Sequence, residues 1–393
     1  MNKKLAVYTF VFFISYIAGI SVAYPLGNKL KKATKDVSSP IVYEPPIEKT
    51  NTTTQEDVNP TAPKTEPCPL NGKLYSKDQR KIWEKRRPLG IMVENHKDSR
   101  PQSGLQNADI IYEAVAEGGI TRFLAVYYCQ DANPVGPVRS ARVYFIQLLQ
   151  AYGENPLYAH VGGANTPGPA DALSLIKKLG WKLYNDLDQF SVPFPYFWRD
   201  YERLKNRAVE HTVYTSTAKL WRFAAQKRRL TDVDKKGIRW DESFTAWRFK
   251  DEENNQLGDA REISFGFWEK NRTGNYSVVW RLNPETRLYE RENGGRPHID
   301  LNRKKPLAFK TIIILFSKES SANDGYPGGH LLYQLKGKGE AIIFSNGKAE
   351  EATWSRREYT DNFSFRAKNG KEIIFERGKI FVEILPIGNK VEY

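Results

Sequence analysis

The chain has 393 residues, of which 40% are hydrophobic and 13% aromatic, so it can bury a core and a wholly disordered protein is excluded. Its length exceeds that of one typical hydrophobic core and predicts two compact domains plus a tail. The 60 basic residues outnumber the 46 acidic ones, and the formal charge of +14 favours a polyanionic partner. The sequence holds no zinc finger, RNP-type aromatic signature or basic recognition helix, so no nucleic acid is expected as that partner.

The first segment, residues 1–24, is predicted to be a transmembrane anchor or a signal peptide. Leu5–Tyr24 contains no charged residue and follows two lysines, and a run of this length spans a bilayer as a helix. A Ser-Val-Ala triplet at 21–23 has the small side chains of a signal-peptidase site, so cleavage stays open. The sequence therefore predicts a protein at the cell membrane, with a single N-terminal span and an extracytoplasmic body.

Residues 25–67 are predicted to form a disordered linker. They are rich in Pro, Thr, Glu, Lys and Asn and poor in large apolar side chains. Such a composition does not bury enough surface to fold. The linker would hold the body at some distance from the membrane.

The two cysteines, Cys68 and Cys129, do not lie in a metal-ligand spacing. In an oxidising compartment they would be able to form one disulfide that ties the end of the linker to a predicted strand. Two separate thiols are the other interpretation, and the sequence leaves both open.

Residues 68–235 are predicted to form a mixed α/β domain. Short apolar runs bounded by Gly, Pro or Asn predict strands at Leu89–Val93, Ile110–Val115, Phe123–Cys129 and Leu157–Val161. Helices are predicted over about 139–152 and 170–179, where apolar residues recur on one face and a glycine follows. A third helix is predicted to begin near Ser216, which is a competent N-cap. Strands that alternate with helices indicate a layered α/β architecture.

Residues 236–393 are predicted to form an antiparallel, β-rich domain. The predicted strands are Ser277–Leu282, Thr311–Phe316, Ala341–Phe344, Glu372–Phe375 and Ile380–Leu385. Asn-Gly pairs at 346–347 and 369–370 lie between such runs, and this dipeptide favours a β-hairpin because both central residues of a type I′ turn need positive φ. The two domains together predict an α+β fold.

Several motifs occur in order along the body. In its first half they are RPLGIMVENH at 87–96, SRPQSGL at 99–105, ADIIYE at 108–113, EGGITR at 117–122, GPVRSAR at 136–142 and YAHVGG at 158–163. In its second half they are YER at 289–291, PHID at 297–300, GKG at 337–339, NGK at 346–348 and TW at 353–354. These motifs resemble those of the YerB-like proteins, a bacterial family of unknown function with an N-terminal and a C-terminal part. The resemblance covers nearly all of 87–386 and implies an exported, two-part protein without an established reaction.

Two departures from the family pattern bear on these expectations. Many relatives carry a lipid-attached cysteine directly after the hydrophobic run, whereas this chain has no cysteine there. Relatives also tend to show Pro-His-Asn before Tyr-Thr-Ser, whereas this chain has Glu-His-Thr at 210–212. The second difference weakens any role assigned to His211.

Arginines at a predicted helix start suggest an anion site. Arg139 and Arg142 lie three residues apart on either side of Ser140, and arginine has the wrong sign to stabilise a helix N-terminus. We therefore expect either a bound anion or a buried carboxylate beside them. The predicted ligand-binding residues are Arg100, Arg122, Arg139, Ser140, Arg142 and His160, the last of which precedes two glycines at a strand end.

Glu113 and Glu117 are the candidates for acid–base catalysis. They are spaced by four, so they project from one face if the strand continues, and paired carboxylates act as proton donor and base in glycosidases. An arrangement of arginines and glutamates that only holds loops in place is the alternative. No histidines fall in an HxxxH or HExxH spacing, so no metal site and no cofactor are predicted.

These observations favour a noncatalytic binding or scaffold protein of the cell envelope, which engages wall polymer or the wall-synthesis machinery. An irregular loop with aromatic and proline residues at 190–201 would either stack a sugar, dock a partner or pack over the core. The alternative function is a hydrolase that acts on a cell-wall glycan or an anionic conjugate through the paired carboxylates. Whether the protein is an enzyme is left open by the sequence.

Overall fold

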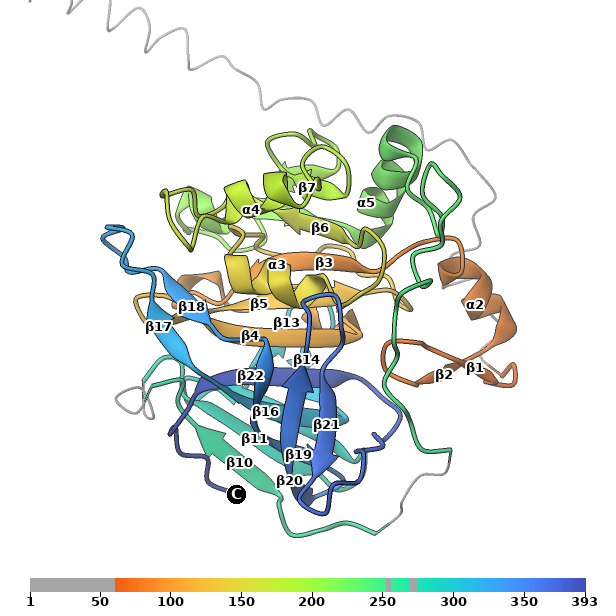
Figure 1. Ribbon diagram of the computed structural model, residues 1–393, viewed down its shortest axis with the longest axis vertical. Coiled ribbons are helices and arrows are strands. Elements are labelled where there is room, and N and C mark those ends of the chain that lie inside the picture. Colours follow the sequence, from red (N-terminus) through yellow and green to blue (C-terminus); the bar gives the residue numbers. More distant parts are fainter. Residues whose placement is uncertain (1–60, 252–255, 269–273) are drawn as a thin grey trace, which may run out of the picture. The chain divides into compact units, whose positions relative to one another are not determined.

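The structure is a computed structural model that describes residues 61–251, 256–268 and 274–393 (Figure 1). All of these residues belong to one compact unit. The predicted anchor or signal peptide at 1–24 and nearly all of the predicted linker lie outside the described residues. Within the described ranges, no helix combines the length and the apolar character needed to cross a membrane.

One mixed sheet of ten strands organises the fold, in the order β21-β20-β19-β16-β22-β4-β5-β3-β6-β7. Its strands are β3 (Leu89–Glu94), β4 (Ile110–Glu117), β5 (Ile120–Tyr127), β6 (Leu157–His160), β7 (Asp186–Asp188), β16 (Thr311–Ser317), β19 (Gly337–Ser345), β20 (Lys348–Arg356), β21 (Ser364–Ala367) and β22 (Ile380–Pro386). Strands from both predicted domains therefore hydrogen-bond within a single sheet. The predicted boundary at 235–236 divides the chain but does not divide this sheet.

Strand β22 joins the two halves. It runs parallel to β16, with Ile380 beside Thr311, and parallel to β4, with Ile380 beside Ile110. Six of its seven residues are buried, as expected for a parallel strand covered on both faces. The C-terminal half thus differs from the purely antiparallel arrangement that we predicted, because its last strand inserts between strands of both halves.

A second, four-stranded antiparallel sheet covers one face of the large sheet. Its strands are β10 (Glu262–Phe265), β11 (Val278–Asn283), β12 (Leu288–Asn293) and β15 (Ala308–Phe309). Trp280 of β11 is fully buried, and its ring centre lies 5.0 Å from that of Phe381 in β22. Leu220 of helix α5 (Thr217–Phe223) joins the same hydrophobic core. Aromatic rings packed edge to face in this way stabilise the contact between the sheets.

Helices α3 (Val143–Leu149) and α4 (Ala172–Lys178) cover the opposite face of the large sheet (Figure 1). Alternate residues of β4 show the division, because Tyr112 packs in the core with α3 while Ile111 packs in the core with the second sheet. The Tyr112 hydroxyl lies 2.8 Å from that of Tyr152, just beyond α3. The large sheet is therefore covered on both faces.

The remaining elements are short. They are β1 (Glu66–Pro67), β2 (Leu74–Tyr75), α2 (Lys77–Trp83), η2 (Lys97–Ser99), η3 (Leu105–Asn107), β8 (Phe197–Arg199), η4 (Val209–His211), β9 (Val213–Thr215), α5 (Thr217–Phe223), η5 (Ala224–Arg228), β13 (Ile299–Asp300), β14 (Lys305–Pro306), β17 (Glu319–Ser321) and β18 (Leu331–Tyr333). The helices predicted over 170–179 and from Ser216 are confirmed as α4 and α5.

Helix α3 begins later than predicted. Val138 forms a β-bridge with the end of β3, and the Ala141 N–H donates to the Gly162 carbonyl oxygen at 2.9 Å. These contacts keep 138–141 extended, so Arg142 is the N-cap and the first helical residue is Val143. Arg139 therefore lies before the helix and not in its first turn, and the anion site that we predicted there stays a prediction.

The two Asn-Gly pairs have different outcomes. Asn346 and Gly347 have φ of 51° and 74° and connect β19 to β20, which confirms the predicted hairpin. Gly370 turns the chain after β21 with φ of 79°, but the predicted strand at 372–375 makes only isolated bridges.

The two cysteines form a disulfide. Cys68 and Cys129 are bonded across a Cα–Cα distance of 6.1 Å. The bond ties the β1–β2 segment to the chain just after β5. The sequence left open whether the cysteines form a disulfide or two separate thiols. The fold brings them close enough to bond, although they lie 61 residues apart in the chain.

Candidate functional site

The candidate site surrounds the carboxyl end of β3. Three groups of polar side chains lie around it. Glu94 and His96 contact Arg139 and His211, and Asn95 donates a hydrogen bond to Glu113. The remaining group includes Arg122, which is the backbone neighbour of Glu94 across β3 and β5. The strand ends at this point because the chain turns into the 3₁₀ helix η2. The end of one buried strand therefore connects the polar groups on both faces of the large sheet.

The first group, the Glu117 network, consists of Glu117, Arg122 and Arg142. Arg122 Nη2 donates to Glu117 Oε1 at 2.9 Å, and Arg142 donates to Oε2 from Nε at 3.0 Å and from Nη2 at 2.6 Å. Burial alone would raise the pKa of Glu117, but the two guanidiniums outweigh it and lower that pKa to about 2. Arg122 also donates to the Ser140 carbonyl oxygen at 3.0 Å. We expected either a bound anion or a buried carboxylate beside Arg142, and the structure shows a carboxylate, that of Glu117.

The second group joins Glu94 to Arg139 and His211. Glu94 Oε1 lies 3.2 Å from Arg139 Nε, and Glu94 Oε2 lies 2.8 Å from His211 Nδ1. The His211 ring in turn stacks on that of His96, with ring centres 5.0 Å apart. Arg139 therefore also meets an internal carboxylate, although its side chain is 27% exposed.

The third group, the buried network, lies between the two sheets. Arg291 of β12 donates to Glu113 Oε2 of β4 at 2.5 Å, and its other terminal nitrogen lies 2.6 Å from His298 Nδ1. Glu383 of β22 lies 3.6 Å from Arg291 and accepts a hydrogen bond from Trp280 Nε1 at 3.0 Å. Glu113, Arg291 and Glu383 are fully buried. A ligand therefore cannot reach Glu113 without separating the sheets.

The protonation states in the buried network follow from its contacts. Burial raises the pKa of Glu383 well above its ordinary value, and the negative charge of Glu113 raises it further, which favours the protonated form of Glu383. Burial lowers the pKa of His298 far below its ordinary value, and so does Arg291, so His298 is neutral. Glu113 and Arg291 form the ion pair at the centre of this network.

Beside the buried network lies a basic pocket of about 590 Å³. It is lined by Lys97, Asp98, Arg100, Pro101, Arg207, Asn275, Asn293, Gly294, Arg296, Pro297, His298 and Ile299. Four of these side chains are cationic and one is a carboxylate, since His298 is neutral. The volume lies in the range of small-ligand sites, and the excess of positive charge favours an anion.

Arg100 is the most enclosed cation of the basic pocket. It donates to the Asn95 Oδ1 at 2.9 Å, to the Asn95 carbonyl oxygen at 3.1 Å and to the Asn275 carbonyl oxygen at 2.7 Å. Among the described residues no carboxylate lies within 4.0 Å of it, so its partners are neutral acceptors. Burial lowers the pKa of Arg100 to about 10, helped by Arg291, and Arg100 therefore stays charged at neutral pH. An anionic ligand would supply the counter-charge that this half-buried guanidinium lacks.

The other cations of the pocket lie at its rim. Lys97 is paired with Asp98 at 3.0 Å. Arg207 and Arg296 are exposed, and neither forms an ion pair within the ranges that the structure describes. These two guanidiniums are therefore available to a ligand that enters the pocket.

His160 is enclosed by its own neighbours in the fold. Its side chain is fully buried, with Nε2 2.6 Å from Asp186 Oδ1 and Nδ1 2.7 Å from the Gly162 carbonyl oxygen. Burial alone would lower the pKa of His160, but the hydrogen bond and the charge of Asp186 raise it. The side chain thus connects β6 to β7 and to the loop after β6.

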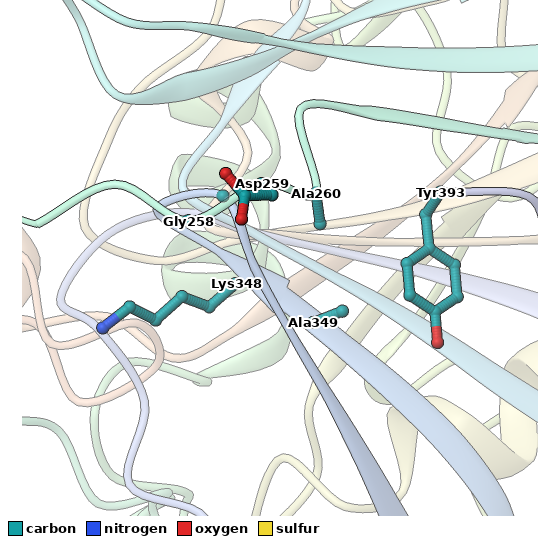
Figure 2. Close-up of a pocket in the computed structure, with 7 residues that line it drawn as sticks. Gly258, Asp259, Ala260, Lys348, Ala349 and Tyr393 are labelled. Atoms are coloured by element: carbon teal, nitrogen blue, oxygen red, sulfur yellow. The ribbon is translucent and has the colours of Figure 1, made fainter.

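A second hollow, of about 500 Å³, lies beside the β19–β20 hairpin (Figure 2). It is lined by Gly258, Asp259, Ala260, Gly347, Lys348, Ala349 and Tyr393. Its cation, Lys348, points away from the Tyr393 ring in Figure 2, and the Asp259 side chain balances it in formal charge. The basic pocket has the larger excess of positive charge, and we take it as the candidate site.

Comparison with known proteins adds a family to this description. The family described as "Protein of unknown function (DUF3048)" matches with its N-terminal domain over residues 74–231 and with its C-terminal domain over residues 268–382. A curated relative, "Putative lipoprotein YerB" of Bacillus subtilis (strain 168), is 30% identical over 333 residues, which are 84% of this chain and 90% of the relative. The chain belongs to the YerB-like family.

The fold of this YerB-like chain also matches a solved structure. The crystal structure of the YerB protein from Bacillus subtilis superposes with a TM-score of 0.65 and 26% sequence identity. The match covers 84% of this chain and all of the crystallised one. The resemblance inferred from the motifs is thereby confirmed.

The basic pocket is formed by both family domains. Lys97, Arg100 and Arg207 come from the N-terminal domain of this YerB-like chain, whereas the residues at 293–299 come from the C-terminal one. Of the six predicted ligand-binding residues, the structure places Arg100 in this pocket. Arg122, Arg139 and Arg142 are held by internal carboxylates nearby, and the roles predicted for the six remain predictions.

Sequence reasoning missed Arg207 and Arg296. Arg207 belongs to no motif, and Arg296 directly precedes the PHID motif at 297–300. The one sequence feature that could have pointed to Arg296 is its neighbour His298, which lies in a family motif and is followed by a strand. That signal does not reveal that the segment faces η2.

Proposed function

We propose that the protein is a noncatalytic binding protein of the cell envelope whose basic pocket binds an anionic wall polymer. The observation that carries the proposal is Arg100, a half-buried guanidinium that has neutral partners only among the described residues. Arg207 and Arg296 add two exposed guanidiniums at the rim. Guanidiniums bind phosphate and carboxylate oxygens through paired hydrogen bonds, so a polymer with repeating phosphates fits this pocket.

Membrane attachment is the second part of the proposal. The Bacillus subtilis relative is named "Putative lipoprotein YerB", which agrees with a location at the membrane. In this chain the uncharged segment Leu5–Tyr24 would replace the lipid as a single span, with the body extracytoplasmic. The linker at 25–67 would then let the body reach into the wall.

The alternative of a hydrolase receives no support from the carboxylates. A general acid needs a pKa near the working pH, whereas Glu117 is ionised down to a pH of about 2 by its two arginines. Glu113 is fully buried and paired with Arg291. Neither side chain is therefore positioned to exchange a proton with a polymer.

A protein of the wall-synthesis machinery is the second candidate partner. Phe190 and Phe194 of the aromatic–proline loop are 78% and 61% exposed, so this part of the loop does not pack over the core. Exposed aromatic side chains are common anchors of protein interfaces. A partner protein would dock on this loop and leave the basic pocket to the polymer.

The test measures binding of the full-length chain, in detergent micelles, to purified poly(glycerol phosphate). The double variant Arg207→Gln/Arg296→Gln removes two rim charges without touching the core. Exposed charge contacts contribute about 1 kcal/mol or less each, so we expect a loss of roughly fivefold to thirtyfold in affinity.

The matched control is Arg357→Gln/Lys368→Gln, because both side chains are exposed, by 92% and 77%, and lie outside the pocket lining. It changes the net charge by the same amount and should retain affinity. Equal losses in the two double variants would show unspecific attraction and would contradict the proposal. Poly-γ-glutamate in place of the phosphate polymer distinguishes a carboxylate ligand from a phosphate one.

A further inference from the structure

We propose that His96, Asp98 and His211 bind one divalent transition-metal ion, best matched by Zn²⁺, at the rim of the basic pocket. One ligand atom from each of the three side chains lies within 4.8 Å of the other two. Two imidazole nitrogens and one carboxylate oxygen form a ligand set typical of zinc. The proposal uses other side chains than the arginines of the proposed function and stands independently of it.

His211 is already oriented for this role. Its Nδ1 lies 2.8 Å from Glu94 Oε2, so Nδ1 carries the proton and Nε2 keeps its lone pair. Metal-bound histidines usually have such a carboxylate partner on the other ring nitrogen, because it fixes the tautomer and the ring orientation. The side chain is only 7% exposed, and no hydrogen bond to its Nε2 occurs among the described residues. A histidine nitrogen that has a lone pair and no protein donor is one that a metal ion would satisfy.

His96 and Asp98 supply the adjustable part of the site. Their side chains are 28% and 38% exposed, and His96 Nδ1 lies 3.7 Å from Asp98 Oδ2. The two imidazole rings are stacked with an angle of 11° between them, whereas lone pairs lie in the ring planes. His96 therefore has to turn about its side-chain bonds to share an ion with His211, and its exposure permits that movement.

The position of the site suggests what completes it. Three protein ligands leave one position of a tetrahedral zinc ion open for water or for an oxygen of another ligand. Asp98 lines the basic pocket, so the open position would face a bound anion. Lys97 competes with the metal for Asp98, because it is paired with that carboxylate at 3.0 Å.

A second cluster of metal-ligating residues, Cys68, Asp109 and Cys129, offers no such site. Its two sulfur atoms are bonded to each other in the disulfide. Among the described residues, the cluster at His96 is therefore the one whose ligand atoms are not covalently bonded to one another.

The test is calorimetric titration of the full-length chain, purified without a histidine tag and treated with a chelator, with Zn²⁺ alone. We expect one equivalent to bind, and His96→Gln and Asp98→Asn each to weaken binding at least about tenfold. Both changes are at the surface and should leave the fold intact. The matched control is Asp78→Asn, which removes another exposed aspartate paired with a lysine, Lys81, and should leave the affinity unchanged.

Two further readouts sharpen the result. Lys97→Gln should bind Zn²⁺ as tightly as the unchanged chain or more tightly, because it removes the competitor for Asp98. Co²⁺ in place of Zn²⁺ should give the visible absorption of a four-coordinate site, and His96→Gln should abolish it. Binding of Zn²⁺ that is absent, or equally tight in His96→Gln and Asp98→Asn, overturns the metal site.

The polymer-binding assay distinguishes a failure of the metal site from a failure of the proposed function. Chelator-treated protein should still bind poly(glycerol phosphate) through the arginines. Retained polymer binding without a zinc site would refute only the metal site, whereas a zinc site without polymer binding would refute only the proposed function.

Discussion

Glu117→Gln measures how much this carboxylate stabilises the fold. The substitution keeps the size of the side chain but removes the counter-charge of Arg122 and Arg142, which are 4% and 7% exposed. The pKa of Glu117 falls from an ordinary 4.5 to about 2 in the fold, which corresponds to roughly 3 kcal/mol of stability at neutral pH. Breaking a buried ion pair costs about 3–5 kcal/mol, a range that includes the value obtained from the pKa of Glu117.

The pH dependence has a definite sign. Because the pKa of Glu117 is lower in the folded chain than in the unfolded one, its stabilisation is complete above about pH 4.5 and is lost as the pH falls toward about 2. The free energies of unfolding of the unchanged chain and of Glu117→Gln should therefore differ most at neutral pH and converge in acid.

Urea unfolding of the full-length chain, followed by tryptophan fluorescence at pH 7, 5 and 3.5, measures this difference. Glu285→Gln, an exposed glutamate, is the control and should change the stability by less than about 0.5 kcal/mol. A loss below about 1 kcal/mol at pH 7 for Glu117→Gln, or a difference that does not shrink in acid, would refute the reasoning.

Three further outcomes are expected. Glu383→Gln should lower the free energy of unfolding by less than about 1 kcal/mol, because burial favours the protonated form of Glu383. In urea unfolding this variant should be far more stable than Glu113→Gln, because the latter leaves Arg291 buried without a counter-charge. Opening the disulfide by Cys68→Ser should lower the free energy of unfolding by roughly 4 kcal/mol, from the loop of 61 residues that it closes; a loss near zero would show that the bond does not restrain the unfolded chain. Lys97→Gln should leave that free energy within about 0.5 kcal/mol, since its ion pair is exposed.

The fold was predictable where local sequence decides it. The strands at 89–94 and 110–117 are short apolar runs, and the Asn346-Gly347 turn needs only two residues with positive φ. The insertion of β22 between β16 and β4 was not predictable, because it depends on contacts such as that of Ile380 with Ile110. Periodicity along the chain shows which face of a strand is buried and is silent about its neighbour in the sheet.

The candidate site shows the same limit. The conflict of Arg142 with a helix start indicated a compensating anion, and the structure supplies it as Glu117. The partner of Glu113 could not be read from the sequence, because Arg291 lies 178 residues away. The basic pocket could be predicted only through Arg100, since its rim is formed by segments of both domains.

Hydrogen–deuterium exchange of the full-length chain, with and without poly(glycerol phosphate), tests the central claim most directly. Binding in the basic pocket should slow exchange of the backbone amides at 97–100, around Arg207 and at 293–299, and leave the β19–β20 hairpin unchanged. Protection confined to other segments, or no protection at polymer concentrations that saturate binding, would contradict the account.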